Sequence, residues 1–249
     1  MAEETGTGAS VSAGKSIENS SSASSFKVYT RTGDGGSSCL FNMERRDKDD
    51  VIFEALGEVD EVGVALGAAK VWVDELWRLG RCDGEDEIDE VIEEHFDCSS
   101  EIDGLTYRQA LEPLSNRITE IQSRLMDVGS AVATPLDNAP EHKKQRVNFE
   151  DKHVDTLEQW IDEYDEHLPP LKNFILPGGN KPAAFLHLAR TAARRAERRV
   201  VPLARDELID QVIVKYLNRL SDFLYTAARF VVVVDGSQET IYCKAKYMD

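Results

Sequence analysis

The sequence has few cysteines and histidines, and neither residue type is spaced for metal binding. The four cysteines among 249 residues form no CxxC pair, and the five histidines complete no zinc-ligand pattern with them. So long a chain with so few cysteines is typical of free thiols in a reducing compartment. The sequence also contains no Ser/His or Cys/His arrangement that would indicate a nucleophile activated by a neighbouring base.

Basic residues and long apolar runs are scarce as well. Lysine and arginine number 29 against 46 aspartates and glutamates, which gives a formal net charge of −17. Such an acidic chain is predicted to bind neither nucleic acid nor an anionic membrane surface, because both reward a basic protein surface. No apolar run approaches the length of a membrane span. An anionic ligand would therefore need a local basic pocket.

The sequence predicts a disordered N-terminal segment followed by one domain. Residues 1–25 are rich in Gly, Ser, Ala and Thr without periodicity, which predicts disorder. They have no apolar signal core, and their acids make a poor mitochondrial presequence. Residues 26–249 are predicted to form a single domain, interrupted by a strongly acidic insert at about residues 82–104. We interpret that insert as a solvated loop.

Five segments show apolar residues at helical spacing, and strand signals are weak. The predicted helices run from about 50 to 73, 105 to 132, 149 to 167, 182 to 200 and 207 to 234. A polar, turn-rich stretch precedes them and a short extended tail follows. The sequence therefore predicts an all-α fold, a five-helix bundle.

The fourth predicted helix carries a row of arginines. Arg190, Arg194 and Arg198 are four residues apart, so they share one face of the helix. Three neighbouring guanidiniums repel one another unless an anion lies between them, and the guanidinium fork matches phosphate oxygens. A triphosphate would satisfy this row. Spacing alone favours the other interpretation, a solvated charged face balanced by Glu197 and other acids, because runs of charge usually lie on the surface.

Two further features have a functional and an ordinary interpretation. Asn218 on the fifth predicted helix could bond a nucleotide, or it could make a polar contact between helices. Residues 30–38 are rich in Gly, Thr and Ser, so they could fold around phosphates as an anion nest or form an ordinary turn. This stretch is not a Walker A loop, because GxxxxGK[ST] is absent. Asp34 within it could approach a phosphate-bridging metal. His187 is expected to serve packing rather than chemistry.

Eight segments in order resemble the PduO-type ATP:cob(I)alamin adenosyltransferases. They are YTRTGDGGSS, RRDKDD, EALGEVDEVGVALG, DVGSAVATP, LEQWID, LPPLKNFILPGG, RRAERRVVPL and KYLNRLSDFLYTAAR. The resemblance covers nearly the whole chain from Lys27 onward except the acidic insert, and it is nearest to the mitochondrial members of mammals. It implies a five-helix bundle that assembles as a homotrimer, with active sites between subunits.

The resemblance also implies the reaction and its components. The 5′-deoxyadenosyl group of ATP would move to the cobalt of cob(I)alamin, forming adenosylcobalamin and releasing triphosphate. Cobalamin is then a substrate, and Mg²⁺ would be held mainly through the ATP phosphates. A cobalamin reductase and a recipient adenosylcobalamin-dependent mutase are implied as partners. The resemblance suggests a mitochondrial location, although the N-terminus leaves a cytoplasmic one open.

Site residues are implied position by position. The implied catalytic residues are Arg190, Arg194, Asp60 and Phe174. Asp60 would form an ion pair with Arg190 across the subunit boundary. Phe174 would pack against the lower face of the corrin and displace its axial base. The implied ATP-binding residues are Thr30, Arg31, Thr32, Gly33, Asp34, Gly36, Ser38, Cys39, Lys48, Arg190, Arg194, Arg195, Glu197, Arg198 and Asn218.

Other functions are compatible with part of this pattern. A cobalamin chaperone or ATP sensor would bind both molecules without turnover. A helical scaffold with a charged face would explain the arginines but not the glycine-rich stretch. The absence of a protein nucleophile favours the transferase, because reduced cobalt is itself the nucleophile and the protein supplies orientation and charge.

Overall fold

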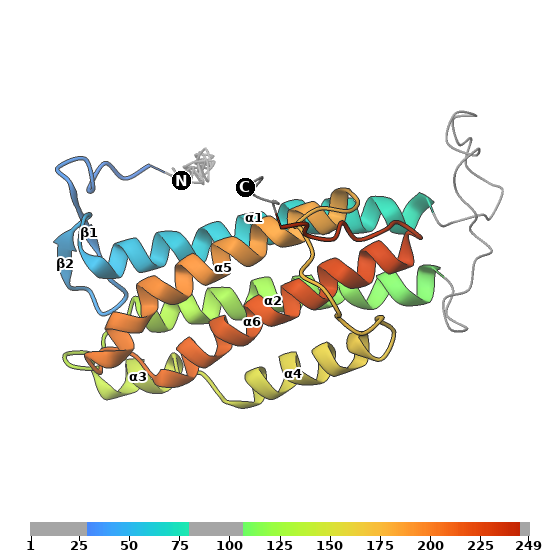
Figure 1. Ribbon diagram of the computed structural model, residues 1–249. Helices are drawn as coiled ribbons and strands as arrows, with labels where there is room; N and C mark the ends of the chain where they lie inside the picture. Colours follow the sequence, from blue (N-terminus) through green and yellow to red (C-terminus); the bar gives the residue numbers. More distant parts are fainter. Residues whose placement is uncertain (1–28, 80–106, 245–249) are drawn as a thin grey trace, which may run out of the picture.

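Five long helices lie side by side and make up most of the described chain (Figure 1). A computed structural model describes residues 29–79 and 107–244. The long helices are α1 (Val51–Leu79), α2 (Tyr107–Val132), α4 (Lys152–Asp165), α5 (Lys181–Arg205) and α6 (Gln211–Val234). The predicted all-α helical bundle is therefore confirmed. The predicted disorder of residues 1–25 and the acidic insert at 82–104 lie outside the described residues.

The bundle is arranged around α1, α5 and α6. Helix α1 packs against both α2 and α5, α5 packs against α6, and α4 lies along the outer side of α6 (Figure 1). Apolar stripes drive this packing: the residues of α1 at three- and four-residue spacing from Ile52 to Leu76 are buried. Alanines line the buried side of α5, so α5 can approach its neighbours closely.

Side-chain caps fix where several helices begin. Asp50, the predicted cap, accepts a hydrogen bond from the Ile52 backbone N–H at 2.8 Å. Asn180 caps α5 by accepting from Ala183 N–H at 3.0 Å, and its amide donates to the Val231 carbonyl of α6 at 2.8 Å. Asp210 caps α6 through Val212 N–H at 2.9 Å. These caps place the starts of α1 and α5 close to the predicted positions, whereas α6 begins later than predicted.

Further local features differ from the sequence expectations. Helix α1 continues to Leu79, past the predicted end near residue 73, because Val73 and Leu76 extend its buried stripe. Helix α5 continues past the predicted end near Val200 because Leu203 and Ala204 extend its buried stripe, and Pro202 lies in its last turn. A short helix, α3 (Glu141–Arg146), precedes α4. The turn-rich stretch forms an antiparallel hairpin of β1 (Ser37–Cys39) and β2 (Arg45–Asp47), with Ser38 opposite Arg46. Such short elements carry little periodic signal.

The C-terminal tail returns to the loop before α5. Ile175 and Ile241 form an isolated antiparallel bridge. Tyr242 N–H donates to the Phe174 carbonyl and Leu176 N–H donates to the Thr240 carbonyl, both at 2.8 Å. The expected extended tail is thus paired with the segment that carries Phe174. Among the described helices, none is both long and apolar enough to span a bilayer.

Gly179 shows how tightly this loop is held against α6. Its φ is +100°, and a Cβ there would overlap Cγ2 of Val232. We expect Gly179→Ala to lower the free energy of unfolding by about 3 kcal/mol, because backbone strain adds to overpacking. Gly178→Ala is the matched control, since a Cβ at Gly178 meets nothing within 4 Å. Denaturant unfolding of both variants measures the difference, and equal stabilities would contradict the close packing.

Candidate functional site

The arginines of α5 divide into two groups with different partners. On the side facing α1, Arg195 forms ion pairs with both Glu58 and Glu61. Arg199 on the same side pairs with Glu54 of α1 at 3.0 Å. These contacts give two of the five arginines between positions 190 and 199 a role in joining helices. The predicted contact of Arg195 with ATP stays a prediction.

The row formed by Arg190, Arg194 and Arg198 is called here the arginine row. Among the described residues none of the three forms an ion pair, although Arg198 donates a hydrogen bond to the Arg194 carbonyl at 3.1 Å. Arg194 and Arg198 are exposed and Arg190 is half-buried. The row therefore presents unneutralised positive charge along one face of an otherwise acidic protein.

Arg190 is the most constrained member of the arginine row. Its Nε is buried without a hydrogen-bond partner, and its guanidinium lies 6.0 Å from the ring centroid of Tyr225. Burial lowers the pKa of Arg190, and the neighbouring Arg194 cation acts in the same direction. Both effects disfavour the charged form, so an anion at this position would relieve them. This environment is typical of a binding site rather than of a solvated helix face.

The neighbouring face of α6 contributes Asn218. Its amide donates to the Glu197 carboxylate of α5 at 2.9 Å. Both side chains flank the arginine row, because Glu197 precedes Arg198 and lies one turn from Arg194. The exposed Asn218 amide is thereby oriented by Glu197 while its oxygen stays available to a ligand.

The glycine-rich stretch forms a compact turn beside the β1–β2 hairpin. Gly36 has a φ of +83°, and its carbonyl accepts from Lys48 N–H at 2.9 Å. A Cβ at Gly33 would lie 3.2 Å from the Lys48 Nζ, so the absent side chain allows this cation to approach. Thr30 and Thr32 share a hydrogen bond of 2.9 Å. Backbone, hydroxyls and an ammonium group thus gather here, as the anion-nest interpretation requires.

Other residues predicted for this stretch lie at its edges. Arg31 has a φ of 59°, and its guanidinium lies 5.4 Å from the Tyr29 ring centroid. Asp34 and Cys39 are exposed, and Ser38 is half-buried on β1. Arg45, which we did not single out in the sequence, holds the turn by donating to the Thr32 carbonyl at 2.9 Å and the Ser37 hydroxyl at 2.7 Å. Its only sequence signal was its place in RRDKDD.

The chain does not bring every predicted site residue together. Across the described part of the chain, no hydrogen bond or ion pair joins Thr30–Gly36 to α5. Asp60 is exposed and lines a groove between α1 and α2, whereas Arg190 faces Tyr225 of α6. Asp60 and Arg190 form no ion pair within the described chain, and their predicted pairing across a subunit boundary stays a prediction.

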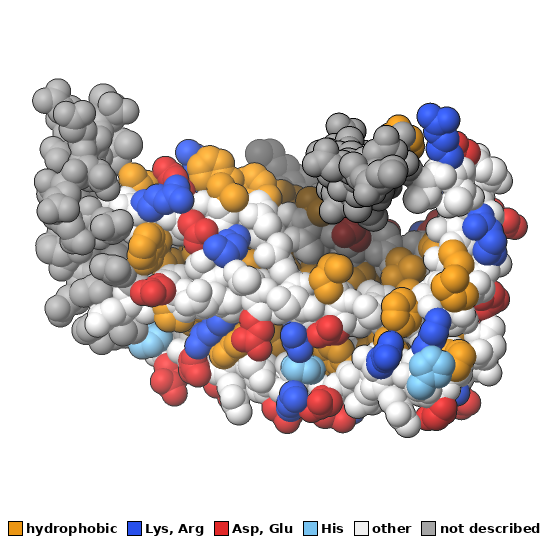
Figure 2. Space-filling view, turned by 180° about the vertical axis from the view of Figure 1, so that it is seen from behind, with side chains coloured by type: hydrophobic (Ala, Val, Ile, Leu, Met, Phe, Trp, Pro, Cys, Tyr) orange, Lys and Arg blue, Asp and Glu red, His pale blue; other side chains and the backbone are white. Residues whose placement is uncertain are grey.

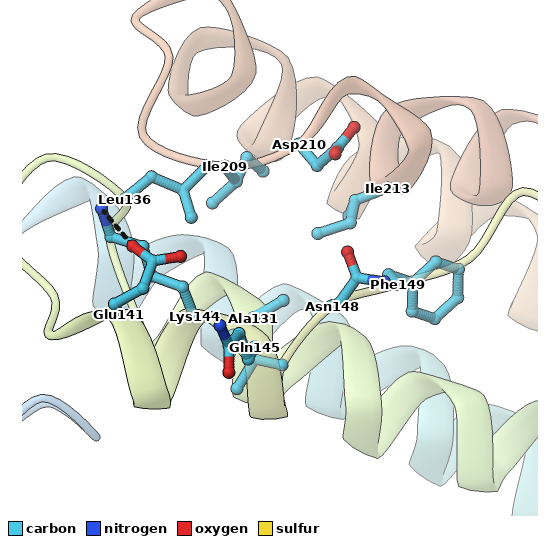
Figure 3. A pocket seen from close by; sticks show the side chains of 11 residues that line it. Ala131, Leu136, Glu141, Lys144, Gln145, Asn148, Phe149, Ile209, Asp210 and Ile213 are labelled. Atoms are coloured by element: carbon cyan, nitrogen blue, oxygen red, sulfur yellow. Dashed lines mark ion pairs between the residues drawn. The ribbon is translucent and has the colours of Figure 1, made fainter.

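The α1–α2 groove is apolar and open. It has a volume of about 600 Å³, and exposed side chains at its edge include Val64, Met126 and Phe41. Figure 2 views the opposite side of the molecule from Figure 1, where apolar side chains lie among charged ones. A separate hollow of about 330 Å³ lies between α3 and the start of α6 (Figure 3). Glu141 and Lys144 at its rim form an ion pair of 3.9 Å, and none of the α5 arginines lines it.

Phe174 stands out among the apolar residues because it is 80% exposed. It lies in the loop before α5, where the C-terminal tail pairs with its backbone. Leu171, Leu176, Ile241 and Tyr242 are also exposed. An apolar surface of this kind on a loop is typical of a ligand or partner contact.

Comparison with known proteins identifies the family. The family model described as cobalamin adenosyltransferase matches residues 28–231. This chain belongs to the cobalamin adenosyltransferase family. The mouse corrinoid adenosyltransferase MMAB is 40% identical over 232 residues, covering 93% of this chain and 84% of the relative. The corrinoid adenosyltransferase of Bacillus subtilis is 36% identical over 216 residues, covering 87% and 92%.

Solved structures agree with the family assignment. A variant of the PduO-type ATP:corrinoid adenosyltransferase from Lactobacillus reuteri, complexed with cobalamin and ATP, matches with a TM-score of 0.67 and 32% identity. The match covers 88% of this chain and all of that one. A second variant of the same bacterial protein, complexed with ATP, matches with a TM-score of 0.65 and 31% identity. The resemblance drawn from the eight sequence segments is thereby confirmed.

This member of the adenosyltransferase family also contains a buried polar cluster between α5, α6 and the tail. His187 is 6% exposed, and its ring centroid lies 6.2 Å from that of Tyr225. Its Nδ1 has no hydrogen-bond partner. The packing role predicted for His187 agrees with this burial. Glu239 of the tail joins this cluster and pairs with Arg229 of α6 at 2.7 Å, a contact between two segments that helical spacing does not predict.

His187 should make the stability of this adenosyltransferase depend on pH. Burial lowers its pKa from an ordinary value of 6.5 to about 4, and the Arg190 cation acts in the same direction. The folded state binds this proton more weakly than the unfolded state does. The stabilisation of the folded state that comes from neutral His187 is therefore full above about pH 6.5 and is lost as pH falls toward 4. Between pH 7 and 4.5 we expect the wild type to lose about 2 kcal/mol more stability than His187→Leu.

Urea unfolding of both proteins across that pH range provides the measurement. His142→Leu, which replaces an exposed histidine on α3, is the control. Parallel pH profiles for the wild type and His187→Leu would show that His187 does not titrate in this interval.

Proposed function

We propose that this chain transfers the 5′-deoxyadenosyl group of ATP to cob(I)alamin, forming adenosylcobalamin and releasing triphosphate. The observation that carries the proposal is the unpaired arginine row of α5 within a chain of the cobalamin adenosyltransferase family. Its neighbours Arg195 and Arg199 have carboxylate partners on α1, whereas the row itself has none among the described residues. Triphosphate supplies the missing negative charge.

The chemistry requires no nucleophile from the protein. The electron pair of cobalt(I) attacks the C5′ carbon of ATP, a cobalt–carbon bond forms, and the C5′–O bond breaks. The bonding pair leaves on the triphosphate, and the cobalt becomes formally cobalt(III). Negative charge therefore grows on the triphosphate, where Arg190 and Arg194 stabilise the transition state. Asn218 and the glycine-rich stretch with Lys48 orient the nucleotide.

Magnesium would reach this site with the nucleotide. Among the described residues, there is no group of three or more His, Cys, Asp or Glu side chains that could hold a metal ion. The hydroxyls and backbone amides of Thr30–Gly36 and the single exposed carboxylate of Asp34 suit a phosphate-bound Mg²⁺ with water ligands. Mg²⁺ bound to the triphosphate would neutralise part of its charge.

A homotrimer with sites between subunits accounts for the separation of the site residues. No hydrogen bond or ion pair joins Asp60 or the glycine-rich stretch to the arginine row in the described chain, and the apolar α1–α2 groove that Asp60 lines offers a surface for a second copy. In the assembly Asp60 would pair with Arg190 and hold its guanidinium in place. The cobalamin reductase, the recipient mutase and the mitochondrial location are expected from the resemblance.

The direct test mixes the purified protein with MgATP and chemically reduced cob(I)alamin under anaerobic conditions. We expect the absorption spectrum of adenosylcobalamin to appear, with one triphosphate released per adenosylcobalamin formed. Omission of ATP provides the control. Binding of both ligands without a cobalt–carbon bond would instead support a chaperone or sensor.

Arg194 is the exposed member of the pair that we assign to triphosphate. We expect Arg194→Ala to raise the KM for ATP and to lower kcat/KM by roughly 10- to 100-fold, because a charged hydrogen bond to phosphate is lost. Arg205→Ala removes an exposed arginine from the last turn of the same helix and is the matched control. Steady-state kinetics with cob(I)alamin would contradict the assignment if both variants behaved like the wild type.

Phe174 is proposed to cover the lower face of the corrin. An apolar ring there keeps water and the axial base away from the metal, so cob(II)alamin accepts an electron more readily. We expect Phe174→Ala to slow the route from cob(II)alamin by roughly 30-fold, which corresponds to about 2 kcal/mol of lost apolar contact. Adenosylation of prereduced cob(I)alamin should change much less.

The two routes are measured side by side, with a reduced flavin as the electron donor for cob(II)alamin. Phe174→Leu keeps an apolar cover and should retain most of the activity on both routes. Equal losses on the two routes in Phe174→Ala would count against displacement of the axial base.

A further inference from the structure

Arg229 of α6 is a buried cation with two partners outside its own helix. Its side chain is 6% exposed, and its Nε lies 2.7 Å from the carboxylate of Glu239 in the C-terminal tail. A terminal nitrogen of the same guanidinium donates to the Pro169 carbonyl at 2.8 Å. One planar group therefore bridges the tail and the segment that leads to Phe174.

Both segments meet again at Phe174. Three residues beyond Glu239, the Tyr242 N–H donates to the Phe174 carbonyl, and between them the Thr240 carbonyl accepts from Leu176 N–H. The loop from Pro169 to Leu176 is thus fixed to α6 at its beginning through Arg229 and to the tail at its end. Glu239 anchors that tail to the same guanidinium.

Contacts of the Phe174 side chain itself do little to fix its position. It is 80% exposed, so packing within the chain restrains it little. Its location is set by the backbone to which it is attached, and that backbone is paired with the tail. A buried ion pair adds little net stability, because desolvation offsets the attraction of the charges, but it favours one arrangement of the segments it joins.

We propose that Arg229 is a positioning residue for Phe174 and acts through Glu239 and the Pro169 carbonyl. The three groups are called here the tail clamp. This inference rests on the proposed function, because it assigns the clamp to the corrin-facing side of that site. Loosening the clamp should let the Phe174 loop move while the arginine row and the nucleotide turn stay in place.

The first test replaces Glu239, which lies in the tail and not in the helical core. We expect Glu239→Ala to slow adenosylation from cob(II)alamin by roughly tenfold, since small misplacements of a catalytic group are costly. The KM for ATP and the rate with prereduced cob(I)alamin should stay within about twofold of the wild type. Glu239→Gln retains a hydrogen-bond acceptor for Arg229 and should restore part of the cob(II)alamin rate.

Glu158→Ala is the matched control. Glu158 accepts from Arg219 Nε at 2.8 Å, so the variant removes a carboxylate, a more exposed one than Glu239, from another arginine of α6 on the side facing α4. We expect it to leave both routes unchanged. The electron paramagnetic resonance spectrum of bound cob(II)alamin gives a second readout, because it reports whether an axial base is coordinated. Glu239→Ala should shift this spectrum toward the base-coordinated form.

A second pair of variants tests the link without removing a charge. Tyr242→Pro deletes the N–H that bonds the Phe174 carbonyl, whereas Tyr242→Ala removes the ring and keeps the N–H. We expect the proline variant to lose several-fold more cob(II)alamin activity than the alanine variant. This comparison remains informative if Glu239→Ala folds poorly, because Tyr242 is exposed and lies outside the helical core.

The outcomes separate the clamp from the proposed function. If the wild type forms no adenosylcobalamin from cob(I)alamin, the proposed function itself fails. If the wild type is active but Glu239→Ala and Tyr242→Pro keep the wild-type ratio of the two routes, the clamp has no positioning role. Equal losses on both routes, or a raised KM for ATP, would likewise overturn the inference, because they would indicate general damage.

Discussion

The distribution of negative charge around α5 determines which of its arginines have a carboxylate partner within the described chain. Glutamates of α1 neutralise Arg195 and Arg199 on one side, and this joins the two helices. The arginine row on the other side receives no carboxylate from the described chain. A net charge of −17 therefore does not prevent the binding of an anionic nucleotide, because the acids that lie close to α5 are engaged elsewhere. The excess of acid keeps other anions at a distance while the row attracts one of suitable shape.

The proposed assembly would also supply the carboxylate that the arginine row lacks. Arg190 is partly buried against Tyr225 and has an unsatisfied Nε, whereas Asp60 is exposed in an apolar groove on another side of the bundle. Of the two side chains, Arg190 is the one that lacks a partner for a buried atom within the described chain. In a trimer each would meet its complement from a neighbouring copy, and burial of the groove would provide the apolar contact area that holds the copies together.

Periodicity predicted the long helices well because burial on one face is a repeating signal. Residue type also predicted the cap at Asp50, whereas the Asn180 cap of α5 was not predicted. The same periodic signal could not find the β1–β2 hairpin, whose strands have three residues each, or α3 with six.

The candidate site, like the fold, could be predicted only where a repeating spacing indicates it. Spacing placed the arginine row on one face, but only the packed structure shows that Glu58 and Glu61 engage Arg195 and leave Arg190 without a carboxylate. Arg45 and Glu239 were not identified from the sequence, because their partners lie 8 to 13 residues away in other segments, outside helical spacing.

One face of α6 supports both halves of the proposed site. Tyr225 lies beneath the guanidinium of Arg190, and Arg229, one helical turn further on, holds the tail and the loop of Phe174. A helix is stiff over one turn, so the separation between these two supports is nearly fixed. The triphosphate end of the nucleotide would be held above the first support and the corrin above the second. Since the reaction requires the C5′ carbon and the cobalt to meet in line, a common rigid support for both substrates limits the misalignment that each could introduce.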